Sequence, residues 1–165
     1  MNTALASSAL GLLLTGVVVV GAVHEEQLND PLPTNFVLFI AAVCGDTIDT
    51  EVGELRRTVA VGQIASAKIS VDEARRRELF RLASATRLFD YPARYNPPFE
   101  GGFAVPYPQY TIRVVAGERR HEIRWEAMRI ATPDAERLSR FVRAVYDMFR
   151  TEPTVQALPP GLPCM

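Results

Sequence analysis

The strongest constraint on the fold is a stretch in which apolar and charged side chains alternate. Residues 110–126 read YTIRVVAGERRHEIRWE, and the middle, Ala116-Gly117-Glu118, has the composition of a tight turn. The apolar set comprises Tyr110, Ile112, Val114, His121, Ile123 and Trp125. Because successive side chains on a strand point to opposite faces of a sheet, the pattern predicts an antiparallel hairpin with one apolar and one charged face.

Further strands are predicted upstream of this hairpin. Residues 36–43, FVLFIAAV, form an apolar run of strand length that ends at the turn residues CGDT. Residues 50–63 mix valines with charged residues, and we interpret them as the hairpin partner of the first strand, with Gly53 at a turn or bulge. The following stretch, IASAKIS, is expected to lead into a helix.

Two helices complete the predicted domain. Ser70 and Glu73 have the S-x-x-E spacing of a capping box, and Thr132 followed by Pro133 is typical of a second helix start. After Pro133, apolar residues recur every three or four positions at Leu138, Phe141, Val142, Val145 and Phe149. The element order therefore predicts an α+β fold, a ββα–ββα domain whose antiparallel sheet is covered by two helices.

The N-terminal segment carries no charged side chain before residue 24. From Ala4 to Val23 only Ser7, Ser8 and Thr15 interrupt the apolar run, and at about 1.5 Å per residue a helix of this length spans about 30 Å, the thickness of a bilayer core. We interpret it as a hydrophobic helix that anchors the chain in a membrane through residues 4–23. The alternatives are an export signal cleaved near Ala22 and a buried soluble element.

These features divide the chain into four parts. Residues 1–23 are the anchor or signal, 24–35 a proline-containing linker, 36–150 the α+β domain and 151–165 a proline-rich tail. No Lys or Arg follows the apolar run until Arg56, which favours a domain on the exported side, periplasmic or extracellular. Cleavage would instead give a secreted or periplasmic protein.

Charge does not favour a nucleic-acid partner. The formal net charge is −1, so the chain lacks the basic footprint of a nucleic-acid-binding protein. The first predicted helix nevertheless concentrates arginines at Arg75, Arg76, Arg77, Arg81 and Arg87. We interpret this set as a solvated helix face, and the alternative is a patch that binds anions or an acidic partner.

A long irregular stretch between the first helix and the hairpin is the candidate binding region. Residues 90–109 contain five prolines and several aromatic residues, and long loops of this kind are often functional. The aromatic rings either pack on the domain or present a surface to a protein partner. The candidate partner-binding residues are Tyr91, Arg94, Tyr95, Phe99, Phe103 and Tyr107.

The sequence offers little catalytic chemistry. No nucleophile elbow, zinc-protease, P-loop or dinucleotide motif is present, so no cofactor, metal or small-molecule substrate is expected. His121 lies in a predicted strand, where a packing role is favoured over a catalytic one. Cys44 and Cys164 could form one disulfide in an exported protein, and the alternative is two free thiols.

The hairpin, preceded by LFDYPARYNPP and followed by PDAERLSRFVRAVYDMF, is similar to a group of small bacterial α+β domains that includes emfourin-type inhibitors of metalloproteases. The resemblance covers about residues 36–150 and carries over no functional residues. We predict a non-enzymatic interaction module, anchored or exported, such as an accessory subunit of a membrane complex. The alternatives are a soluble, exported, protease-inhibitor-like binder and a hydrolytic enzyme that uses His121.

Overall fold

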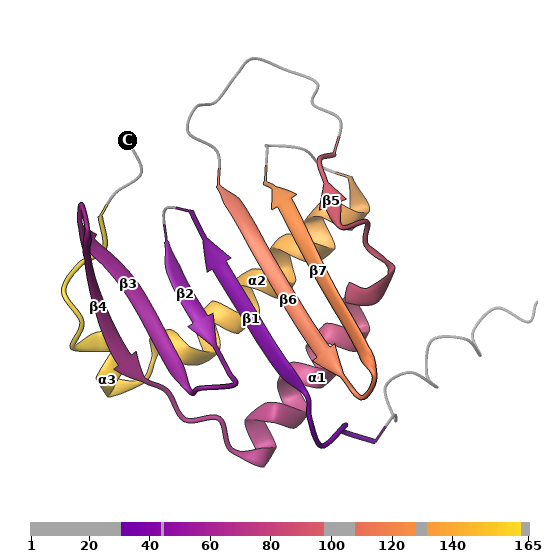
Figure 1. Cartoon of the computed structure of the whole chain (residues 1–165), viewed down its shortest axis with the longest axis horizontal. Coiled ribbons are helices and arrows are strands. Elements are labelled where there is room, and N and C mark those ends of the chain that lie inside the picture. Colours follow the sequence, from indigo (N-terminus) through magenta and orange to yellow (C-terminus); the bar gives the residue numbers. More distant parts are fainter. Residues whose placement is uncertain (1–30, 44, 98–107, 128–131, 163–165) are drawn as a thin grey trace, which may run out of the picture.

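A seven-stranded sheet forms the centre of the computed structural model, which describes residues 31–43, 45–97, 108–127 and 132–162 (Figure 1). The strand order is β4-β3-β2-β1-β6-β7-β5, and every neighbouring pair is antiparallel except β5 with β7. The strands are β1 (Val37–Ala42), β2 (Asp46–Asp49), β3 (Glu54–Ala60), β4 (Gln63–Lys68), β5 (Arg94–Tyr95), β6 (Gln109–Ala116) and β7 (Arg119–Glu126).

The helices lie on one side of this sheet. Figure 1 shows α1 (Glu73–Thr86) and α2 (Pro133–Arg150) behind the strands, with the short α3 (Pro153–Gln156) near β3 and β4. A 3-10 turn, η2 (Leu88–Asp90), follows α1. The described domain therefore has two layers, and no described helix covers the second face of the sheet.

The core lies between the sheet and the two long helices. Alternate residues of the central strands face the helices and are buried, among them Leu38, Ile40, Ile48, Leu55, Ile112, Val114, Ile123 and Trp125. The apolar stripe of α2 packs against them, and α1 adds Leu79 and Ala83. Hydrophobic burial thus fixes which way each strand faces, because a one-residue slip would turn every side chain to the opposite face.

The predicted α+β class, the hairpin and the second helix are confirmed. β6 and β7 pair from Gln109–Glu126 to Ala116–Arg119, and Gly117 at the turn has a φ of 64°, which glycine adopts without steric cost. Thr132 caps α2 by accepting a hydrogen bond from the Ala135 amide, 3.1 Å away.

The ββα arrangement predicted for the first half is wrong, because four strands precede α1. Asp46 and Thr47, expected in a turn, begin β2, and Gly53 lies in the turn to β3. IASAKIS was expected as a lead-in to the helix, but most of it forms β4. The turn that allows this is at Gly62, whose φ of 73° lets the chain reverse after β3.

The start of α1 also differs from the predicted capping box. Asp72 is the N-cap, and its side chain accepts a hydrogen bond from the Arg75 amide at 2.8 Å. Ser70 lies outside the helix, and its amide donates instead to the Glu152 carboxylate. Aspartate serves as well as serine at an N-cap, and β4 extends too close to Ser70 for the helix to begin there.

The segment after α2 packs on the sheet. Val155 of α3 is buried, the Thr154 hydroxyl donates to the Lys68 carbonyl at 2.9 Å, and the Leu162 amide donates to the Thr58 carbonyl at 2.7 Å. The described part of the proline-rich tail therefore packs against β3 and β4, at one end of the sheet.

The predicted N-terminal segment, residues 1–23, lies outside the described residues, and none of the described helices is long and apolar enough to cross a membrane.

Candidate functional site

The structure separates the predicted partner-binding residues into different environments. Tyr91 is in the core with 6 % of its surface exposed, Tyr95 is half-buried and Arg94 is exposed. Phe99, Phe103 and Tyr107 lie outside the described residues. So do Cys44 and Cys164.

Tyr91 is held from several sides. Its hydroxyl donates to the Asp134 carbonyl in the first turn of α2 at 2.8 Å, and its carbonyl oxygen lies 2.7 Å from Nε2 of His121. Its ring meets that of Tyr95 edge to face, with the centroids 5.2 Å apart. Burial raises the pKa of the Tyr91 phenol, so the residue is a neutral hydrogen-bond donor inside the domain and its ring is not a contact surface.

His121 has a structural contact for one ring nitrogen. In addition to its approach to the Tyr91 carbonyl, its ring lies tilted against Phe89, with the centroids 6.4 Å apart. This geometry makes Nε2 the donor and leaves Nδ1 as the free position. No group of three or more His, Cys, Asp or Glu side chains within the described ranges is placed to hold a metal ion.

Arg94 belongs to the uncovered face of the sheet. β5 pairs with β7 in parallel, which places Arg94 opposite Arg124, and the β6–β7 register places Arg124 opposite Thr111. The row continues across the central strands through Ala41, Thr47, Arg56 and Ser66. Figure 1 shows this face toward the viewer, with both long helices on the far side.

The uncovered face carries a surplus of cationic side chains. Its basic residues are Arg56, Lys68, Arg94, Arg113, Arg120 and Arg124, and its acidic residues are Asp49, Glu54, Glu122 and Glu126. Glu122 lies between two of the arginines, 3.0 Å from Arg124 and 4.0 Å from Arg113. Arg94 and Arg120 have no carboxylate within 4 Å among the described residues.

A polar pocket of about 270 Å³ lies where β5, β6 and β7 meet at one end of this face. Arg94 and Arg124 line it together with Asn96, Thr111 and the buried Trp125. The indole N–H of Trp125 has no hydrogen-bond acceptor within the described part of the chain. The pocket therefore offers two guanidinium groups, with the Glu126 carboxylate also on its wall, so its net charge is positive.

The arginines of α1 are mostly neutralised by neighbouring groups. Arg77 pairs with Glu73 and Arg81 with Glu78 along the helix. The remaining contacts join Arg75 to Glu152, Arg76 to the Thr34 carbonyl and Arg87 to Asp90. The interpretation as a largely solvated face with local pairs fits this arrangement better than an anion-binding patch does.

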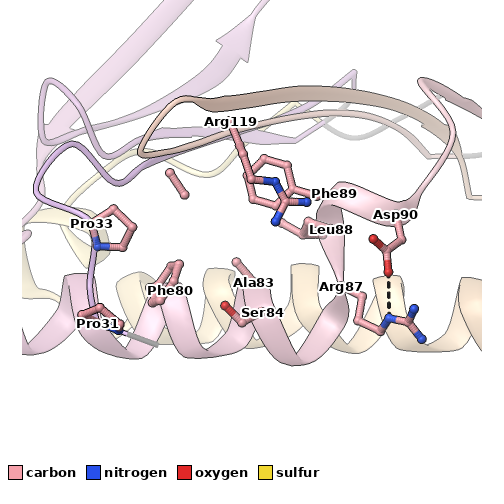
Figure 2. A pocket seen from close by; sticks show the side chains of 11 residues that line it. Pro31, Pro33, Phe80, Ala83, Ser84, Arg87, Leu88, Phe89, Asp90 and Arg119 are labelled. Carbon is pink, nitrogen blue, oxygen red and sulfur yellow. Dashed lines mark hydrogen bonds and ion pairs between the residues drawn. The ribbon is translucent and has the colours of Figure 1, made fainter. Parts of the chain in front are cut away.

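A second, less polar pocket of about 330 Å³ lies on the helix side of the sheet (Figure 2). Phe80, Ala83 and Ser84 of α1 form its floor, and Leu88 and Phe89 of η2 close one end. The remaining lining residues are Pro31, Pro33, Arg87, Asp90, Ala116 and Arg119. No sequence pattern predicts this pocket, because its walls come from three segments that are far apart in the chain.

The uncovered sheet face was not predicted as a site either, although its signal was present. The alternation that buries Ile123 and Trp125 also places Arg120, Glu122 and Arg124 together on the opposite face.

Comparison with protein-family models, with curated proteins and with solved structures finds no match for this chain.

Proposed function

We propose that this chain is a non-enzymatic protein-binding module, anchored in a membrane or exported by its first 23 residues, that binds an acidic partner over the uncovered face of its sheet. One observation carries the proposal: α1 and α2 lie on the same side of the sheet, and the other face carries more arginines and lysines than acids. An accessory subunit of a membrane complex would use such a face.

The central contact on this face combines an aromatic ring with a guanidinium group. The guanidinium carbon of Arg113 lies 3.8 Å from the centre of the Phe39 ring, and Glu122 flanks the same arginine. Stacking on a ring holds a guanidinium flat and leaves its edge free to hydrogen-bond outward. Arginine and aromatic residues are also the types enriched at protein interfaces.

Electrostatics favour an acidic partner. Arg94 lies on β5, next to β7, and Arg120 lies on β7 itself. Neither has a carboxylate within 4 Å among the described residues. A partner that brings carboxylates to these positions gains charge-assisted hydrogen bonds without displacing an internal ion pair. The face is only moderately basic, so a partner with scattered carboxylates fits it better than the uniform charge of nucleic acid.

A paired comparison of charge reversals tests the proposal. The full chain, tagged at its C-terminus, is purified from gently solubilised membranes, and its reproducible partner is identified and its affinity measured. Arg94→Glu with Arg124→Glu should weaken the complex by at least about tenfold, because like charges then face each other across the interface. Determining the N-terminal residue of the mature chain separates a retained anchor from a cleaved signal.

The control variant carries the same change on the helix layer. Arg143→Glu with Arg77→Glu also reverses two exposed arginines; Arg77 pairs with Glu73, and Arg143 has no ion pair with any described residue. It should leave the affinity unchanged. Equal loss of the partner in both variants would show that only net charge matters, and unchanged affinity in the Arg94/Arg124 variant would remove this face from the interface.

A further inference from the structure

Most of the residues that line the pocket on the helix side are apolar. Phe80 and Ala83 project from α1, and Leu88 and Phe89 project from η2 toward the same space (Figure 2). Ala116, at the end of β6, also lines the pocket. Pro31 and Pro33 border the opposite end. The volume of about 330 Å³ is at the lower end of the range for small-molecule sites, so a narrow apolar chain fits better than a wide ring system.

One cation of the pocket has no ion-pair partner in the part of the chain that the structure describes. The guanidinium of Arg119 lies over the Phe89 ring at 3.9 Å, and no carboxylate of the described residues lies within 4 Å of it. Arg87 differs, because its Nε donates to the Asp90 carboxylate at 2.8 Å. In Figure 2 this pair lies beside the pocket, while Arg119 reaches over it from the strand above.

We propose that this pocket binds a single-chain anionic amphiphile, a fatty-acid carboxylate. Its hydrocarbon chain lies along Phe80, Ala83 and Leu88, and its carboxylate accepts hydrogen bonds from the edge of Arg119. The apolar walls and a guanidinium that meets no carboxylate within the described ranges match the two parts of such a molecule, and the Phe89 ring keeps the guanidinium in place. This site lies on the opposite side of the sheet from the proposed partner-binding face and is independent of it.

The position of the pocket in the chain also suits this occupant. Pro31 and Pro33 form part of its border and follow the apolar run of residues 4–23 after a short connection. The seven residues 24–30 reach at most about 25 Å when fully extended. A chain anchored through its apolar run would therefore hold this pocket near the membrane surface, where fatty acids concentrate.

Photolabelling of the intact protein tests the proposal. The full chain is reconstituted in phosphatidylcholine nanodiscs, incubated with a diazirine analogue of dodecanoate, irradiated and digested for mass spectrometry. Label should appear on peptides that contain Phe80 and Phe89. Unlabelled dodecanoate should compete, and dodecanol should need about tenfold more, since it lacks the charge that Arg119 would bind.

Two variants locate the site and a third is the control. Ser84→Trp fills the pocket from α1 and should abolish the label. Arg119→Glu should reduce it by about tenfold, whereas Arg120→Glu, the same charge change on the other face of β7, should leave it unchanged. Circular dichroism of each variant confirms folding, and Arg119→Glu decides the test if Ser84→Trp does not fold.

Several results would overturn the proposal. Label outside the pocket peptides, equal competition by dodecanol, or equal labelling of the Arg119→Glu and Arg120→Glu variants would each show that the amphiphile is not held by this cation in this pocket. Partner binding is measured on a different face with different variants, so it can fail while the labelling succeeds, and the reverse is also true.

Discussion

Tyr91 gives the sharpest test of the structure, because its sequence context predicts a contact residue and the structure buries it. The ring is 6 % exposed, and its hydroxyl donates to the Asp134 carbonyl at 2.8 Å. Truncation of a buried aromatic residue to alanine costs about 3–5 kcal/mol. We therefore expect Tyr91→Ala to lower the free energy of unfolding by about 4 kcal/mol.

A conservative variant, Tyr91→Phe, separates the contribution of ring packing from that of hydrogen bonding. Tyr91→Phe keeps the ring and removes two hydrogen bonds of the hydroxyl, the one it donates to the Asp134 carbonyl and a longer one it accepts from Arg137 Nε at 3.4 Å, a loss of about 1–2 kcal/mol. For a chain of this size each kcal/mol corresponds to about 2–4 °C in melting temperature, so Tyr91→Ala should melt about 10 °C lower and Tyr91→Phe only a few degrees lower. The larger part of the loss thus comes from packing against Tyr95 and the core.

Urea unfolding followed by circular dichroism measures both values, and an unchanged slope with denaturant shows that the two states compared are the same. Arg94→Ala is the control, since this exposed neighbour should change stability by no more than about 0.5 kcal/mol. If Tyr91→Ala cost less than about 1 kcal/mol while partner capture fell, Tyr91 would be a contact residue and its burial in the structure would be wrong.

Two further predictions concern buried hydroxyl groups. Thr50→Val keeps the side-chain volume but removes the oxygen that accepts from the Leu38 amide at 2.8 Å and donates to the Leu38 carbonyl at 2.9 Å, so it should cost about 1–3 kcal/mol in urea unfolding and speed hydrogen exchange at that amide. Tyr146 donates to the Asp46 carbonyl at 2.5 Å, and burial raises the pKa of its phenol. Because the unfolded chain releases the Tyr146 proton more readily, this group should contribute stability that is complete below about pH 10 and is lost as the pH rises above it, and Tyr146→Phe should flatten that alkaline decline. A decline just as steep in the variant would assign it to other groups.

The parts of the fold that the sequence predicted well have signals confined to one segment. In residues 110–126 the period of two runs along both strands and a glycine stands at the turn, so the elements and the buried faces follow from local patterns. α2 likewise combines an N-cap, a proline at its first position and a continuous apolar stripe. Each of these features indicates the same structure independently, which makes the prediction robust.

The strands before α1 lack such agreement. β2 is only four residues long, and β4 contains alanines, a serine and a lysine in place of the usual branched residues. Both strands pair with β3, which lies between them and places Leu55 in the core. Pairing with β3 therefore determines the structure of β2 and β4, and no hydrophobic periodicity within either strand predicts it.

The candidate sites were hidden for a related reason. Tyr91 has the same local context as an exposed loop aromatic, and only the approach of α2 and His121 shows that it is inside. The lipid pocket that we propose draws on α1, η2 and the β6–β7 turn at once. Sites formed by segments far apart in sequence have no characteristic residue spacing, so they can be recognised only in the folded structure.

The register of one strand separates the two proposed surfaces. Arg119 and Arg120 are adjacent in sequence, yet β7 turns the first toward the pocket on the helix side and the second toward the uncovered face, where it lies opposite Val115. The burial of Ile123 and Trp125 holds this register, because a slip by one residue would expose both side chains and exchange the two arginines. The same core contacts that fix the sheet therefore keep an amphiphile site and a partner face apart, so each can be altered by charge reversal without altering the other.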